Sequence, residues 1–410
     1  MSGRLNWLLS SSALSNLADG IGRVAFPLLA TTLTRDPVLI AGLAAIQQLP
    51  WLLFSAISGV LLDRTDRRRA MLLANLTRAL VIGLLAAVVL LDTLSITVIY
   101  LAALLVGAAE VVADSAANVL IPAVVERDRL ESANSKLQTI ETVCQTFVGN
   151  PVGSIAFAAF AALPFLLGSG AFAVAAVLLV ALAGSLAPRP APRPAGRHRL
   201  RGELAAGIRW LRGHTLMARL VVIVALLGLT IEFSQAQLVL YALQDLDLGE
   251  AAFGVFALAA GAGGVLGAAV TPALTKVLPR RGVLVGGIVL IGTATAAMGF
   301  VHAPIPAGVL LGAFGAGVVG SNVIIATARH LAVPDELLGR VLGVWRTLVW
   351  GAMPIGALIG GLLTRTLGSP SETFIVSGVC VAAIGVAAAF ALRPFPADLD
   401  TRQESRSTTA

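Results

Sequence analysis

Long runs of apolar residues separated by short polar stretches dominate the pattern of this chain. Each run is long enough to cross about 30 Å of hydrocarbon as a helix that rises about 1.5 Å per residue. The fifth and sixth runs are separated only by Leu163 and Pro164, so ten or eleven crossings remain open as alternatives to twelve. The twelve predicted segments lie near residues 7–33, 38–62, 70–91, 95–123, 137–162, 164–187, 216–241, 251–276, 282–301, 305–331, 337–364 and 371–392.

A proline- and arginine-rich stretch over residues 188–199 divides these segments into six and six. Its composition predicts an extended linker, and the apolar face of residues 203–212 predicts a short amphipathic helix at the membrane surface. The predicted organisation is an N-terminal six-helix bundle (1–187), a cytoplasmic linker (188–214), a C-terminal six-helix bundle (215–392) and a disordered cytoplasmic tail (393–410).

Composition agrees with a membrane location. The 410 residues are 57% hydrophobic and only 12% charged, whereas soluble domains carry about 25% charged residues. The net charge of +7 does not indicate nucleic-acid binding, because the arginines lie in short loops and no basic domain with interleaved aromatic residues is present. Lysine and arginine are concentrated in alternate loops, which predicts a multi-pass cell-membrane protein with both termini in the cytoplasm. The predicted fold class is all-α integral membrane.

The most charged short loop follows the second segment. It reads Gly59-Val60-Leu61-Leu62-Asp63-Arg64-Thr65-Asp66-Arg67-Arg68-Arg69 and connects two bilayer-length apolar runs. Such a loop predicts a membrane hairpin with its turn on the cytoplasmic side. A magnesium-diphosphate site at these aspartates is disfavoured, because four arginines compete for the carboxylates and no second aspartate-rich loop completes a metal pair.

Several motifs resemble those of the major facilitator superfamily. The spacing of Gly59, Asp63, Arg64 and Arg67 is similar to that of the loop after the second helix in these transporters. Residues 15–20, 128–134 and 149–153 resemble its twelve-helix drug/proton antiporter branch, which includes macrolide, multidrug and enterobactin exporters.

This resemblance implies two pseudo-symmetric six-helix bundles and export by alternating access. It also implies that Asp63 takes part in gating, together with Gly59, Arg64 and Arg67, while Arg68 and Arg69 mainly fix the orientation. Gly149, Pro151 and Gly153 would form an antiporter motif. The chain departs from the family pattern at Asn150 and at Asp66, where glycine is common.

Ionisable residues inside the apolar segments are the candidate functional groups, because each costs at least about 2.5–3.5 kcal/mol at bilayer depth. Asp19 and Arg23 are four residues apart and can neutralise each other, and equal depth favours a pair between Arg78 and Asp114. Two carboxylates one turn apart, Glu110 and Asp114, disfavour simultaneous ionisation, so one of them can carry a proton. The predicted proton-coupling residues are, in order, Glu110, Asp19, Glu232, Asp114 and Glu141; the alternative for each is a structural ion pair.

Other candidates complete the prediction. Arg23, Arg78 and Arg346 are ion-pair candidates, and for Arg346 a bridge between the halves is favoured over contact with an anionic substrate. Neither Cys144 nor Cys380 indicates a disulfide or a metal site, and no Gly-Lys-Ser/Thr sequence indicates ATP coupling.

The predicted function is proton-coupled efflux of an amphiphilic small molecule (a drug, a macrolide-like compound or a siderophore). The expected partners are this substrate, protons and the lipid bilayer, with a monomeric chain and no cofactor, metal or nucleic acid. A nutrient importer of the same fold is the alternative. A polytopic membrane enzyme is less favoured, because the four histidines are scattered and no catalytic constellation occurs.

Overall fold

The computed structural model describes residues 2–125, 130–181 and 207–393, and their regular secondary structure is helical throughout. Side chains at 2–4, 55–64, 119, 121–124, 131, 335–336 and 338–339 lie outside this description. The helices form two compact units, one comprising Met1–Arg193 with Ala242–Leu258 and the other Pro194–Tyr241 with Ala259–Ala410.

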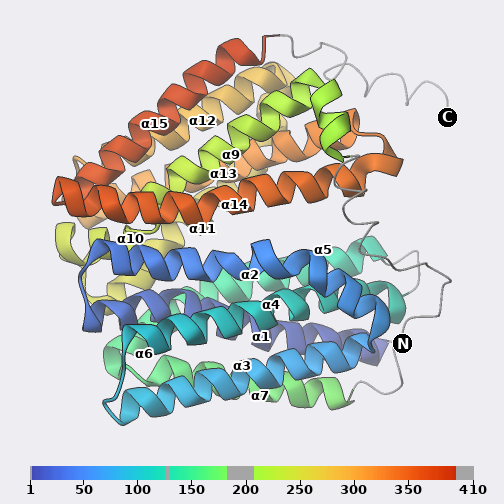
Figure 1. The fold of residues 1–410 in the computed structure, drawn as a ribbon, viewed down its shortest axis with the longest axis vertical. Coiled ribbons are helices and arrows are strands. Elements are labelled where there is room, and N and C mark those ends of the chain that lie inside the picture. Colours follow the sequence, from blue (N-terminus) through green and yellow to red (C-terminus); the bar gives the residue numbers. More distant parts are fainter. Residues whose placement is uncertain (1, 126–129, 182–206, 394–410) are drawn as a thin grey trace. The chain divides into compact units, whose positions relative to one another are not determined.

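The first unit is a bundle in which α1 occupies a central place. This helix packs against α4, α7 and the run formed by α5, η2 and α6, while α3 packs between α4 and α7 (Figure 1). The elements are α1 (Ser2–Leu33), α2 (Pro37–Arg64), α3 (Arg67–Leu90), α4 (Ile96–Val124), α5 (Leu130–Thr142), the π-helix η2 (Val143–Gly149), α6 (Asn150–Ala159) and α7 (Leu163–Ala181).

The second unit is also a helical bundle. Here α12 packs against α13 and α15, and α9 packs against α14 and α15. The elements are α9 (Thr215–Gln235), α10 (Leu238–Leu240), α12 (Arg280–Met298), α13 (Pro304–Ala332), α14 (Asp335–Leu367) and α15 (Pro370–Ala391). The π-helix η3 (Tyr241–Asp245) and α11 (Glu250–Val277) are each divided between the two units, since Ala242–Leu258 belongs to the first. Residues 207–213 are helical as well, so part of the predicted amphipathic segment is a helix, while its location at the membrane surface stays a prediction.

Local sequence explains where several helices begin and end. Asp36 caps α2 by accepting from the Val38 N–H, and Pro37 occupies the first helical position, where its missing N–H costs nothing. Asp66 caps α3 by accepting from the N–H groups of Arg68 and Arg69. The family pattern often has glycine where Asp66 stands, and this capping role accounts for the departure.

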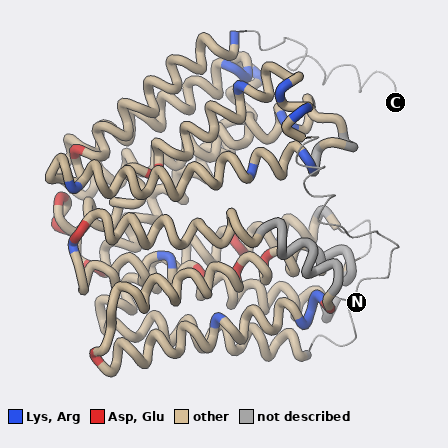
Figure 2. Tube along the Cα trace, viewed as in Figure 1, with Lys and Arg blue, Asp and Glu red and all other residues tan. Residues whose placement is uncertain are grey.

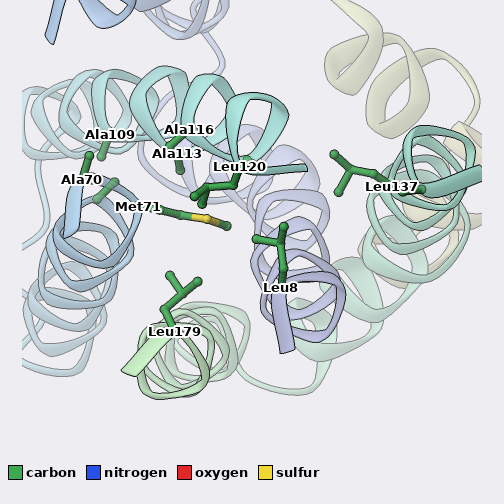
Figure 3. Close-up of a cluster of buried hydrophobic side chains, with 12 residues drawn as sticks. Leu8, Ala70, Met71, Ala109, Ala113, Ala116, Leu120, Leu137 and Leu179 are labelled. Carbon is green, nitrogen blue, oxygen red and sulfur yellow. The ribbon is translucent and has the colours of Figure 1, made fainter. Parts of the chain in front are cut away.

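The core of the first unit consists largely of alanine and leucine. Figure 3 shows Met71 of α3, Leu8 of α1 and Leu179 of α7 converging with alanines of α4. Small residues allow helix backbones to approach closely, which drives helix association in a membrane, where apolar burial alone gives little advantage. The cluster contains Leu8, Ala70, Met71, Ala74, Ala109, Ala113, Ala116, Ala117, Leu120, Ala133, Leu137 and Leu179.

All twelve predicted segments coincide with helix over most of their length. Within the described residues, ten helical runs are long and apolar enough to cross a membrane, and the more polar α1 and α5–η2–α6 are not among them. The protein is therefore a multi-pass membrane protein, while twelve crossings stay a prediction. The break between the fifth and sixth segments falls at residues 160–162, slightly earlier than the predicted turn at Leu163 and Pro164.

In the second unit, the distribution of charge follows the predicted alternation of loops. Figure 2 shows that lysine and arginine of the second unit gather mainly at one end of its helices. This is the pattern that orients membrane helices. The predicted linker up to residue 206 and the tail after 393 lie outside the described residues.

Candidate functional site

A buried ion pair connects α3 to α1 in the first unit. Arg78 is fully buried, and its Nη1 donates to both carboxylate oxygens of Asp19 at 2.8 Å. Nη2 donates to Ser15 Oγ and to Asn75 Oδ1, each at 2.6 Å. The guanidinium group also lies over the ring of Phe172 on α7, 4.4 Å from its centroid. The cation is thus held by one carboxylate, two neutral oxygens and an aromatic face.

This pairing corrects the prediction from equal depth, which matched Arg78 with Asp114, whereas Arg23, expected from its spacing to neutralise Asp19, remains a charged neighbour of that carboxylate. Arg78 bonds to Asp19 instead, and the Arg23 side chain, one turn further along α1, is exposed. Residues at equal depth face each other only if their helices turn the right faces together, and depth carries no information about rotation. Ser15, Asn75 and Phe172 were not identified as functional residues from sequence, although Ser15 belongs to one of the family-like motifs.

Three further carboxylates lie near this pair. Glu110 and Asp114 on α4 and Glu141 on α5 are half-buried. Their charged neighbours include Asp19, Arg23 and, for the two α4 residues, Arg78. We refer to Asp19, Glu110, Asp114 and Glu141 as the acidic cluster.

The acidic cluster contains more acids than bases. Four carboxylates face two guanidinium groups, and Arg78 is already bonded to Asp19. Full ionisation would leave a net negative charge in a largely desolvated region, which is unfavourable unless protons or a cationic ligand reduce it. The structure therefore brings together, in one unit, four of the five residues predicted to couple to protons.

The fifth, Glu232, belongs to the second unit. It lies on α9, with 7% of its surface exposed, one turn before the helix ends at Gln235. Nearby polar contacts join α9 to α15, because Ser377 Oγ donates to the Thr230 carbonyl at 2.7 Å and lies 3.1 Å from Ser234 Oγ.

Arg346, the remaining ion-pair candidate, is exposed on α14. Its charge acts on Arg329 of α13, whose guanidinium lies 5.0 Å from the ring centroid of Trp345. The predicted bridge from Arg346 to the other half stays a prediction.

The antiporter-like motif lies where α1 crosses η2 and α6. A Cβ on Gly149 would come within 2.7 Å of the Gly20 Cα, and one on Gly153 within 2.7 Å of the Ile21 carbonyl oxygen. Pro151 is close to the start of α6, directly after the π-helix η2, and removes one backbone donor. Its glycines are therefore required for close helix packing, and the coupling role of the motif stays a prediction.

The predicted gating motif is only partly described. Gly59, Asp63 and Arg64 belong to the last turns of α2, but their side chains lie outside the described residues, whereas Arg67 is half-buried at the start of α3.

Arg68, which was assigned to orientation alone, has a specific structural contact. Its Nε and Nη2 donate to the Leu179 and Val180 carbonyls at the end of α7, both at 2.6 Å. Both carbonyls lie in the last described turn of α7, and a cation near the C-terminal end of a helix interacts favourably with the helix dipole. No sequence signal pointed to this contact.

In the described part of the chain, no group of three or more His, Cys, Asp or Glu side chains could hold a metal ion. The polar side chains of the first unit instead form an extended network of charges, amides and hydroxyls.

Comparison with known proteins agrees with this arrangement. The sequence profile described as "transmembrane secretion effector" matches residues 3–408. The multidrug efflux pump Tap of Mycolicibacterium fortuitum is 25% identical over 410 residues, which cover 98% of each chain.

Solved structures extend the comparison. The nucleoside transporter NupG matches 96% of this chain and 100% of its own with a TM-score of 0.75 and 13% identity. A bacterial homologue of the iron transporter ferroportin, in an inward-facing state, matches 94% of this chain and 98% of its own, with a TM-score of 0.72 and 17% identity. Identities this low show a shared fold and carry no information about the substrate.

Proposed function

This chain belongs to the transmembrane secretion effector family of the major facilitator superfamily, and we propose that it is a secondary efflux transporter that exchanges protons for an amphiphilic small molecule. Its family and relatives are transporters rather than enzymes. The direction of transport, the coupling ion and the class of substrate are the proposed parts. The name of its relative Tap, a multidrug efflux pump, supports export of a drug-like compound.

The acidic cluster is the observation that carries this proposal. A proton-driven exporter needs a carboxylate that is shielded from water and exchanges a proton during each cycle. Glu110 and Asp114 lie one turn apart on α4, close to Asp19 and its partner Arg78. Proton binding to this cluster would relieve like-charge repulsion, whereas proton loss would allow Arg23 and Arg78 to balance the remaining charges.

An amphiphilic substrate agrees with the composition of the helices. Polar side chains are few and grouped, and the surrounding helices are rich in alanine, leucine, glycine and valine. Such walls bind apolar groups through surface burial and leave a small number of polar groups to orient the molecule. The proposed location is the cell membrane, with both termini in the cytoplasm.

Transport in inside-out membrane vesicles tests the proposal. Vesicles from cells that express the protein would receive an acid-inside pH gradient together with radiolabelled erythromycin or ethidium. Accumulation that requires the gradient and disappears with a protonophore is the expected result. Accumulation in right-side-out vesicles without dependence on the gradient would indicate an importer or facilitator and would contradict proton-coupled export.

A further inference from the structure

Asn150 occupies a position where α1 and the π-helix η2 meet. Its amide lies beside two carbonyl oxygens, which only its nitrogen can bond, so the amide is assigned with the nitrogen toward them; it then donates to the Gly20 carbonyl at 3.3 Å and to the Gln145 carbonyl at 3.2 Å. The two acceptors belong to different helices, so one amide group bonds α1 and η2 together. This position is also where the chain departs from the glycine that is common in related antiporter motifs.

Both acceptor carbonyls lie at an unusually close helix crossing. A Cβ on Gly20 would come within 2.7 Å of the Gln145 Cα and still closer to the Gln145 carbonyl oxygen. A Cβ on Gly149 would meet Gly20 from the opposite side. Backbones this close leave no room for a side chain between them, so a donor reaching both carbonyls must come from the edge of the crossing, where Asn150 stands.

The Asn150 side chain lies at the end of the π-helical turn η2, directly before Pro151, which has no N–H of its own to donate. A π-helical turn is also less stable than an α-helical one and persists where other contacts support it. The Asn150 amide bonds to the Gln145 carbonyl within η2, and it therefore supports the widened turn from inside the same run.

A second contact between the same elements lies one turn away along α1. Gln145 Nε2 donates to Asn16 Oδ1 at 2.8 Å, and Asn16 Nδ2 donates in turn to the Ser12 carbonyl at 2.7 Å. Asn16 and Gly20 are four residues apart, so η2 is joined to α1 at two successive turns. Asp19 lies between these two points.

We propose that Asn150 is a positioning residue: its amide clamps Gly20 of α1 to η2 and thereby holds Asp19 in register with Arg78. An α-helix turns by about 100° per residue. A small rotation of α1 would therefore move the Asp19 carboxylate away from Nη1 of Arg78, which it meets at 2.8 Å. The part of this inference that concerns transport rests on the proposed function, whereas the clamp itself does not.

The chain contains a native reporter for the clamp. Cys144 lies in η2 and is half-buried, and Cys380 on α15 is the second of the two cysteines. In a Cys380→Ser background, the rate at which N-ethylmaleimide labels Cys144 in native membranes reports how often η2 opens. Asn150→Asp replaces the donating amide by an acceptor of similar size, and Asn150→Ala removes the amide without adding charge.

Both variants should raise the labelling rate of Cys144 by about five- to tenfold, the change in opening equilibrium expected when one or two hydrogen bonds are lost. Thr139→Val is the matched control, because Thr139 Oγ1 donates only to the Ser135 carbonyl of its own helix at 2.9 Å. Its labelling rate should equal that of the parent. Equal rates in the Asn150 variants and the parent would overturn the clamp.

A transport measurement distinguishes positioning from contact with the cargo. The Asn150 variants should lower the maximal rate of ethidium or erythromycin export and leave the half-saturating concentration unchanged. A raised half-saturating concentration with an unchanged maximal rate would overturn the positioning role. If the parent protein exports neither probe, the proposed function is wrong for these compounds. The labelling rate of Cys144 still tests whether Asn150 holds α1 and η2 together.

Discussion

Arg78 and Asp19 form a buried pair in which one guanidinium nitrogen donates to both carboxylate oxygens at 2.8 Å. Removing one member of such a pair leaves an uncompensated charge and typically costs about 3–5 kcal/mol. Because of the acidic cluster, loss of Asp19 and loss of Arg78 should destabilise the protein by different amounts. Asp19→Asn leaves Arg78 near Glu110 and Asp114, whereas Arg78→Gln leaves the carboxylates with only one basic neighbour.

We therefore expect Arg78→Gln to destabilise the protein more than Asp19→Asn, and the double variant to recover part of the loss. Thermal unfolding of the purified variants in detergent measures their relative stabilities. Arg219→Gln is a suitable control, because Arg219 is bonded through Nη1 to the Ala391 carbonyl but is exposed. Equal destabilisation by all three single substitutions would show that the buried pair contributes no more to stability than the exposed contact of Arg219.

Glu110→Gln should abolish the dependence of export on the pH gradient, since an amide neither binds nor releases a proton. Asp114→Asn should have a smaller effect on this dependence, because Glu141, a neighbouring carboxylate, can bind and release a proton in place of Asp114. Glu232→Gln, in the second unit, tests whether coupling is confined to the acidic cluster. The measurement is substrate accumulation in inside-out vesicles with and without the gradient; unchanged coupling in all three variants would exclude these residues as proton carriers.

Gly20→Ala should destabilise the first unit by about 1–3 kcal/mol, as overpacking of a tight crossing does. The added methyl group would lie within 2.7 Å of the Gln145 Cα, and a backbone cannot move aside as a flexible side chain can. Gly22→Ala, on the same helix, is the matched control, because its nearest neighbour would be the Phe26 ring at 3.7 Å. Unfolding in mixed micelles should show a lower stability for Gly20→Ala than for Gly22→Ala. Equal stability of the two variants would contradict the close crossing of α1 and η2.

The sequence was sufficient to predict properties that depend on one helix alone. Apolar runs and their lengths predicted the helices, because hydrophobic length is a property of each segment alone. Asp19, Glu110, Asp114 and Glu141 were also singled out as candidates one by one, since ionisable groups at bilayer depth are rarely without a role, but their grouping in one site was not predicted.

The partners of these residues could not be predicted in the same way. The bond from Arg78 to Asp19, rather than to Asp114, depends on how α1, α3 and α4 are rotated about their axes. The role of Phe172 depends on which helix packs behind Arg78. The motif departure at Asn150 was visible in the sequence, but only the crossing of α1 with η2 gives it a reason.

Arg68 and Arg69 allow the structural and topological roles of loop arginines to be separated. Arg68 bonds to two carbonyls at the end of α7, whereas Arg69 is exposed. Replacing either one by glutamine removes the same positive charge from the same loop, so any effect on membrane orientation should be equal. Arg68→Gln alone should also destabilise the protein, by about 1–2 kcal/mol, because two charge-assisted hydrogen bonds to a helix end are lost and their partial exposure limits their strength.

Thermal unfolding of both variants, with protease accessibility of the termini as the measure of orientation, checks this expectation. Lower stability for Arg68→Gln together with unchanged orientation in both variants would assign Arg68 to the contact with α7. If the two variants unfold alike, the contact with α7 contributes nothing measurable, and the arginines of this loop act through their charge alone.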